Sequence, residues 1–193
     1  MKARKPTIFL IIVLTVFFVM NVSFLSWAQN NNQSSTTNEY KDETNGLTFQ
    51  IPEGINLYTT ENPGPLASQI SMDAPYIFVN PAFTEENINV KITENISEND
   101  LADFKKMLED NPSQPLPGYR RISVRTIKIG TDKNKTAIEH IFIMQGNILG
   151  KLRQVVFVNN GRGFIFTCAT AVDRFDNANQ QFFQRVFDSM VFK

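Results

Sequence analysis

The sequence predicts an α+β domain, an antiparallel sheet with helices packed on it. Two observations carry this prediction. Three strand-like segments separated by tight-turn signals fill residues 136–169, and an aromatic segment follows at residues 173–189. That segment repeats its apolar side chains at steps of three, four and seven, which places them on one broad face of a helix. Such a face needs a surface to cover, and the preceding strands supply one.

Length and composition favour one domain with appendages. The chain has 193 residues, of which 42% are hydrophobic, enough for a substantial core. The formal net charge is zero, but Lys2, Arg4 and Lys5 belong to a leader without acids, so 16 basic residues face 19 acidic ones after it. This balance argues against a general nucleic-acid binder, and we expect no nucleic-acid partner.

The N-terminus has the three parts of a secretory signal. A basic start is followed by an apolar run at residues 8–25 and by Ser26-Trp27-Ala28, with small residues where signal peptidase cleaves. The run is also nearly long enough to span a bilayer, so residues 1–28 are either a signal peptide or an N-terminal membrane anchor. Both alternatives place the rest of the chain outside, secreted or anchored on the outer face of the cytoplasmic membrane.

A polar segment separates this leader from the folded part. Residues 29–44 are almost all polar, and such a composition cannot offset the entropy cost of ordering. We therefore predict a flexible polar linker at residues 29–44 and one α+β domain at residues 45–193.

The first half of the domain reads as short strands and one helix. Alternation or compact apolar runs predict strands at residues 47–51, 55–60, 76–79 and 88–92, interrupted by loop signals such as Asn62-Pro63-Gly64-Pro65. Ser97, with Asp100 three residues later, is a capping-box pattern that begins a helix over Glu98–Asp110. Its buried face carries Leu101, Phe104, Met107 and Leu108.

The strand at residues 121–129 breaks its own pattern. Ile122 and Val124 share one phase, whereas Ile127 and Ile129 share the other. A bulge near Arg125-Thr126 would restore a single apolar face and turn a basic row toward solvent. The alternative is a strand buried on both faces. The basic row consists of Arg121, Arg125 and Lys128.

The second half reads as a meander. Strands are predicted at residues 136–145, 149–159 and 162–169, joined by Gly146-Asn147 and Asn160-Gly161. Asn-Gly pairs suit tight hairpins because both residues tolerate positive φ.

This arrangement resembles PsbP-type domains. The resemblance covers residues 40–193 and rests on the signal, the polar tether, the opening strand Gly46-Leu47-Thr48-Phe49-Gln50-Ile51-Pro52 and the closing segment from Phe164 to Ala171 with its aromatic helix. It implies an α/β/α sandwich with a central antiparallel sheet and a binding or assembly role without catalytic machinery. Ile55 stands where tryptophan is common in the family.

Chemistry-bearing residues are few. The single histidine, His140, shares its strand phase with Ile138 and Phe142, so we expect a buried, hydrogen-bonded side chain. The single cysteine, Cys168, lies in an apolar strand, and a catalytic pair with His140 is the alternative. Carboxylates at Glu98, Asp100, Asp173 and Asp176 suit helix starts. We therefore predict no catalytic, cofactor or metal site.

The charged residues suggest one candidate binding patch on the surface. Arg121, Arg125 and Lys128, with Lys151 and Arg153, would bind an acidic partner or an anionic surface if their strands are adjacent; the alternative is a solvated edge protected by charge. Asn95 and Asn134 begin glycosylation sequons.

Three functions follow from these features. The first is a non-enzymatic module that binds or assembles an envelope or membrane protein complex. The second is a carrier or sensor of a small apolar ligand, with a cleft under the loop at residues 59–71. The third is a hydrolase with a perturbed histidine or carboxylate pair.

Overall fold

The computed structural model describes residues 39–111, 116–145 and 149–193. The predicted leader and residues 29–38 of the predicted linker lie outside this part of the chain. Within it, no helix combines the length and the apolar character needed to cross a bilayer.

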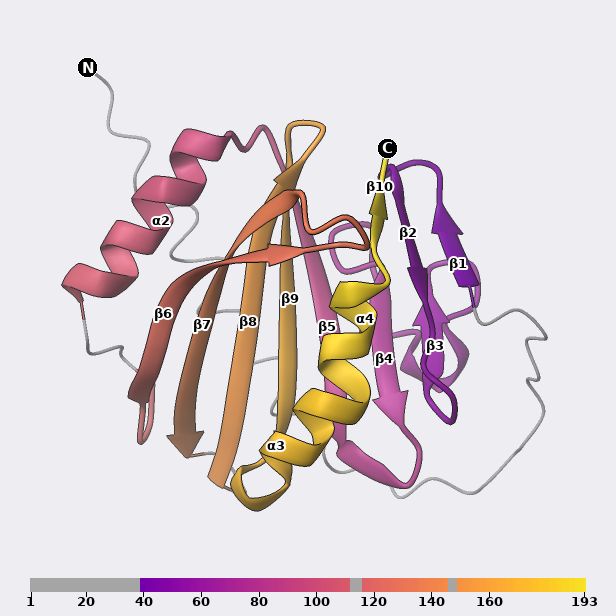
Figure 1. The fold of residues 1–193 in the computed structure, drawn as a ribbon. Helices are drawn as coiled ribbons and strands as arrows, with labels where there is room; N and C mark the ends of the chain where they lie inside the picture. Colours follow the sequence, from indigo (N-terminus) through magenta and orange to yellow (C-terminus); the bar gives the residue numbers. More distant parts are fainter. Residues whose placement is uncertain (1–38, 112–115, 146–148) are drawn as a thin grey trace.

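A seven-stranded antiparallel sheet forms the centre of the fold (Figure 1). Each predicted strand is present, and the last three form the expected meander. Across the sheet the order is β3 (Asn56–Thr59), β4 (Tyr76–Asn80), β5 (Phe83–Glu94), β9 (Arg162–Ala171), β8 (Leu149–Asn159), β7 (Lys135–Gln145) and β6 (Arg120–Ile129).

A smaller sheet joins the two ends of the domain. Its strands are β1 (Glu39–Asp42), β2 (Leu47–Gln50) and β10 (Val191–Phe192), with β2 in the middle. The predicted linker boundary at residue 44 is therefore wrong, because β1 already belongs to the fold. Tyr40 explains the difference, since its ring packs 5.4 Å from that of Phe49 and 5.6 Å from that of Tyr76.

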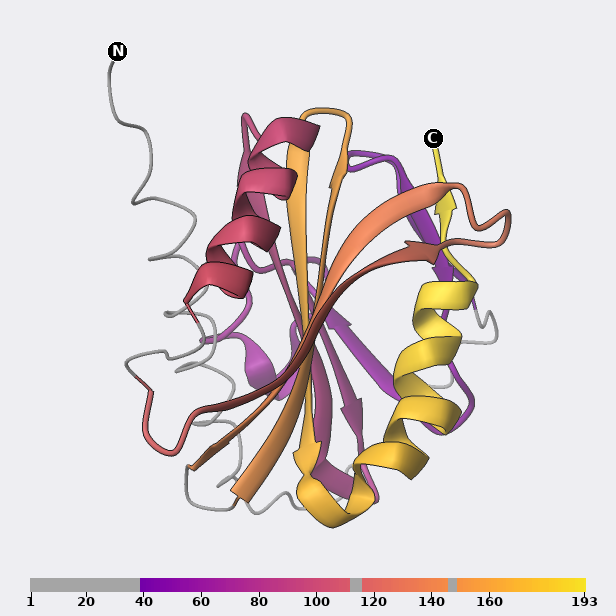
Figure 2. The ribbon, with the colours of Figure 1, turned by 60° about the vertical axis from the view of Figure 1, so that its left-hand side comes forward.

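Helix α2 (Glu98–Asp110) covers one face of the central sheet (Figure 2). Its start is the predicted capping box, in which Ser97 and Asp100 each bond the backbone N–H of the other. Leu101, Phe104 and Leu108 are buried against Ile138, Val156, Val158 and Ile165 of the sheet.

The C-terminal helical segment covers the opposite face (Figure 2). It begins with a 3₁₀ turn, η3 (Val172–Arg174), and continues as α3 (Phe175–Ala178), a π-helical turn η4 (Asn179–Phe183) and α4 (Gln184–Asp188). The aromatic face is buried as predicted, with Phe182, Phe183, Val186 and Phe187 in the main core. The two helical layers and the sheet between them make the expected α/β/α sandwich.

Strand β6 corrects the predicted bulge. The register shifts between Arg121 and Ser123, so Ile122 is the extra residue and not Arg125 or Thr126. After the bulge, Val124 packs against the core between the sheet and α2, whereas Ile127 packs against the core on the opposite face of the sheet. The strand thus carries apolar side chains on both faces, but the predicted alternative of a strand buried on both faces is also wrong, because Val124 and Ile127 are only half-buried. Its charged side chains avoid burial because β6 lies at the edge of the sheet.

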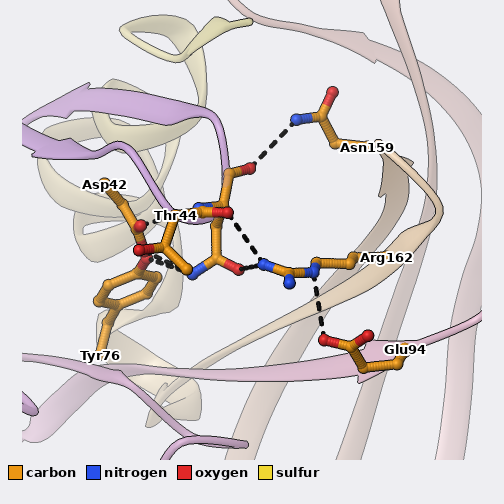
Figure 3. A network of polar contacts seen from close by, with 7 residues as sticks. Asp42, Thr44, Tyr76, Glu94, Asn159 and Arg162 are labelled. Atoms are coloured by element: carbon orange, nitrogen blue, oxygen red, sulfur yellow. Dashed lines mark hydrogen bonds and ion pairs between the residues drawn. The ribbon is translucent and has the colours of Figure 1, made fainter.

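A polar network ties the small sheet to the central one (Figure 3). Arg162 donates to the Thr44 carbonyl at 3.0 Å and to Asn45 Oδ1 at 2.6 Å, and it pairs with Glu94 at 3.2 Å. Asn159 reaches the same turn through the Asn45 and Gly46 carbonyls. The network lies beside the tight turn at Asn160-Gly161, where both residues have positive φ, and Arg162 is the first residue of β9 after this turn.

Candidate functional site

His140 and Cys168 do not meet. His140 lies opposite Gln154, which lies opposite Thr167. The side chains of these three residues therefore lie on the face of the sheet that α2 covers. Cys168 is the next residue on β9 and belongs to the core under the C-terminal helix. Strand β8 and the thickness of the sheet therefore separate the thiol from the imidazole.

His140 is the buried, hydrogen-bonded residue that its strand phase predicts. It is 2% exposed, and its Nε2 lies 2.9 Å from the Tyr119 hydroxyl. Burial lowers the pKa of His140 to about 4, although the nearby Gln154 side chain opposes this effect. No described residue makes a hydrogen bond of ordinary geometry to His140 Nδ1 or to the side-chain oxygen Oε1 of Gln154. The ring is thus neutral at physiological pH.

Cys168 has the properties of a core side chain. It is fully buried, and burial raises the pKa of its thiol to about 12, while the charge of Arg153 acts in the opposite direction. A thiol that stays protonated is a poor nucleophile. Neither residue in this pair is placed for nucleophilic catalysis.

Positive charge gathers instead at one end of the sheet. Strands β6, β7 and β8 are consecutive neighbours and carry seven basic side chains against one acidic side chain, Glu139, a net charge of +6. The rest of the chain after the leader has nine basic residues against 18 acidic ones. We call these three strands the basic end. Its basic residues are Arg120, Arg121, Arg125, Lys128, Lys135, Lys151 and Arg153.

Glu139 organises the inner part of the basic end. Its side chain is 1% exposed and accepts from Arg153 Nε at 2.9 Å and from Arg125 Nε. Arg153 is itself buried, donates to Asn179 Oδ1 at 2.8 Å and lies 5.0 Å from the centre of the Phe187 ring. The hydrogen bond to Glu139 raises the pKa of the Arg125 guanidinium. The buried acid therefore neutralises one of two arginines and leaves net positive charge outside.

The predicted basic row is not one row. Arg121 points to the α2 side and donates to the Leu108 and Glu109 carbonyls at the C-terminal end of that helix, where a cation is favourable. Arg125 lies on the opposite face with Glu139. Lys128 is exposed and bonds Thr136 Oγ1 at 2.9 Å. The bulge at Ile122 shifts the alternation of β6, so Arg121 and Arg125 lie on opposite faces of the sheet.

Solved structures with the same architecture come from bacteria. The solution structure of cyanobacterial PsbP (CyanoP) from Synechocystis sp. PCC 6803 matches over 88% of this chain and 99% of that chain, with 19% identity and a TM-score of 0.55. The chain has a PsbP-like fold. A crystal structure from Bacteroides thetaiotaomicron VPI-5482 matches 81% of the PsbP-like chain and 48% of its own length, with 10% identity and a TM-score of 0.54. No family model and no curated protein matches the sequence.

The expected ligand cleft of this PsbP-like domain is occupied by its own side chains. Leu66, in the 3₁₀ turn η2 (Gly64–Leu66), is buried against Ile77 and Val79. A separate apolar crevice between α2 and strands β5, β8 and β9 has a volume of ≈ 20 Å³. That volume is about what one water molecule needs. Neither place offers room for a drug-sized ligand.

The other candidate groups remain apart. Among the residues that the structure describes, no three His, Cys, Asp or Glu side chains converge as a metal site would require. Asp176 is 3.6 Å from Lys151, whose ammonium lies 4.1 Å from the centre of the Phe175 ring. The sequon residues Asn95 and Asn134 are both exposed.

Sequence reasoning missed Glu139 and Arg120. Glu139 lies in a mostly apolar stretch of β7, and the strands on either side of it carry arginines. An acid in such a strand could have predicted a buried ion pair with one of these arginines. Arg120 lies one residue before the predicted strand and belongs to it in the structure.

Proposed function

We propose that this chain is an exported, non-enzymatic binding or assembly module that docks on an envelope or membrane protein complex through its basic end. The observation that carries the proposal is the separation of charge. Strands β6, β7 and β8 carry a net charge of +6, whereas the rest of the chain after the leader has nine basic residues against 18 acidic ones. Complementary potentials steer association and select partners, so the surface suits an acidic docking site.

The placement of the histidine and the cysteine, the fold and the leader pattern also support this proposal. The sole histidine is buried and neutral, and the sole cysteine is buried on the other face. The PsbP-like fold is compatible with a non-catalytic module, although fold alone does not transfer function. The leader pattern at residues 1–28 supports export, with residues 8–25 as a membrane tether if they are retained.

Site-specific crosslinking in the native host tests the proposal. A photoreactive residue replaces Thr126, which is exposed on β6, in the full-length chain. A matched control carries the same residue at Gln180, exposed on the C-terminal helical segment. We expect a discrete envelope protein to crosslink from residue 126 and not from residue 180. Equal crosslinking from both sites, or none from residue 126, would contradict docking through the basic end.

Protease protection tests the location. Protease added to intact cells or spheroplasts should degrade the folded domain without lysis, whereas a cytoplasmic marker should survive. Survival of both proteins until lysis would refute export.

A further inference from the structure

Strand β6 is an unusually long open edge. It is the last strand of the central sheet and contains ten residues, Arg120–Ile129, paired with β7 on one side only. Among the described residues, no backbone hydrogen bond outside the β6–β7 ladder reaches residues 120–129. An edge of this kind exposes a row of N–H and C=O groups that can pair with another strand.

The bulge leaves most of this edge regular. It falls at Ile122, so residues 123–129 pair with β7 in unbroken register. Ile129 is buried and the next residue, Gly130, donates to the Phe187 carbonyl, so residues 123–128 are the open part of this regular run. Six residues match the length of a typical strand, which is about five to six residues. Ile122 is 47% exposed, and Val124 and Ile127 are half-buried on opposite faces. Apolar side chains are therefore available to contact those of an added strand on both faces.

The charges on β6 select among possible occupants. Four of its ten residues are basic and none is acidic, and Arg120, Arg125 and Lys128 are exposed. The Arg125 side chain is 64% exposed even while it pairs with the buried Glu139. Pairing β6 with β6 of a second copy would place these cations side by side, and like charges on adjacent strands destabilise a sheet. An acidic strand would instead place its carboxylates beside these cations, and opposite charges on adjacent strands stabilise a sheet.

We propose that β6 accepts an extended acidic segment of a partner protein as an eighth strand of the central sheet. This inference rests on the proposed function and names its means of recognition. Backbone hydrogen bonds hold the segment, and side-chain charges select it. Arg125 and Lys128 are three residues apart and point to opposite faces of the sheet, so the segment carries two acidic residues three apart, one beside each cation.

A peptide of alternating Thr and Val, nine residues long, with two Glu residues three apart, serves as the probe. The control peptide has Lys in place of both Glu residues. Each is titrated into the exported protein as purified from its host, and amide hydrogen exchange is followed by mass spectrometry. We expect binding of the acidic peptide only, with slowed exchange confined to β6. Raising the salt concentration should weaken this binding, because exposed charge pairs are screened.

Two perturbations separate strand addition from simple charge attraction. N-methylation of alternate residues along one edge of the acidic peptide removes its donors on that edge, and we expect one of the two edge-methylated peptides to lose at least about tenfold in affinity. Lys128→Glu in the protein should weaken binding about tenfold, whereas Lys106→Glu, on exposed α2, should leave it unchanged. Binding that tolerates methylation of either edge would overturn the inference.

The remaining outcomes are also decisive. Protection outside β6, or binding only to vesicles containing phosphatidylglycerol, would refute strand addition and point to a different surface or to an anionic membrane. If residue 126 crosslinks to an envelope protein while β6 gains no protection from any acidic peptide, the proposed function stands and strand addition is wrong. If the peptide binds β6 but no envelope protein crosslinks, the docking role fails and the edge inference survives.

Discussion

Replacing Glu139 by methionine should strongly destabilise the domain. The substitution keeps a similar side-chain volume but leaves Arg153, whose side chain is 4% exposed, without its carboxylate partner. The contacts of Arg153 with Asn179 and Phe187 hold the guanidinium in place, so it cannot easily move into water. Removing one partner of a buried ion pair costs about 3–5 kcal/mol, and we expect a loss in that range.

Replacing the partner, Arg153, by methionine should cost less stability. In Arg153→Met the carboxylate of Glu139 keeps its hydrogen bond to Arg125, so no charge is left unpaired. We expect a loss of about 1.5–3 kcal/mol, the usual range for a hydrogen bond to a charged group. The double variant replaces both ions by apolar chains, which is often neutral or stabilising. It should therefore be more stable than Glu139→Met alone.

Urea unfolding followed by far-UV circular dichroism measures these differences. With a slope of about 2 kcal/mol/M, Glu139→Met should lower the midpoint by about 2 M. Glu53→Met, in an exposed turn, is the control and should stay within about 0.5 kcal/mol of the parent. A double variant whose loss equals the sum of the two single losses would refute the reasoning, because independent sites add and a coupled pair does not.

Other predictions concern the histidine, the cysteine and two glycines. Because burial lowers the pKa of His140 from 6.5 to about 4, the unfolded chain binds the extra proton first as pH falls, so about 3 kcal/mol of stability is lost between pH 6.5 and 4. His140→Phe should flatten that part of the pH–stability curve, and an NMR titration of the single imidazole with a midpoint near 6.5 would contradict it. Cys168 should resist a thiol reagent at pH 8 until urea unfolds the protein, and rapid labelling of the native state would show that the thiol is accessible. Gly130→Ala should lower the free energy of unfolding more than Gly161→Ala, as measured by urea unfolding. Both glycines have positive φ, but a Cβ at Gly130 would lie 2.9 Å from the Phe192 ring, whereas one at Gly161 meets nothing within 4 Å. Equal losses of stability would show that φ alone accounts for the effect.

Local signals were sufficient for most of the strands and for α2. Alternation in β2 and β5, the Asn160-Gly161 turn and the Ser97–Asp100 capping box each act within a few residues. Such patterns need no knowledge of the remaining fold, so reading them from one sequence works. The same holds for the buried face of the C-terminal helical segment.

The missed features depend on distant partners. Strand β1 is ordered because Tyr40 finds aromatic neighbours on β2 and β4, which no local pattern reveals. The bulge at Ile122 depends on how β6 pairs with β7. The π-helical turn at Asn179–Phe183 begins at the residue that bonds Arg153. In the candidate site, the positive strands were visible in the sequence, whereas the burial of Glu139 and Arg153 required their register.

The small sheet has a consequence for biosynthesis. Strand β2, near the beginning of the domain, bonds both β1 and the last strand, and the Lys193 N–H donates to the Gly46 carbonyl at 3.0 Å. Strand β10 is synthesised after every strand of the central sheet, so β2 lacks one of its two partners until this last part of the domain has left the ribosome. Contacts between such distant segments slow folding. A chain that stays unfolded during synthesis remains able to thread through a narrow translocation channel.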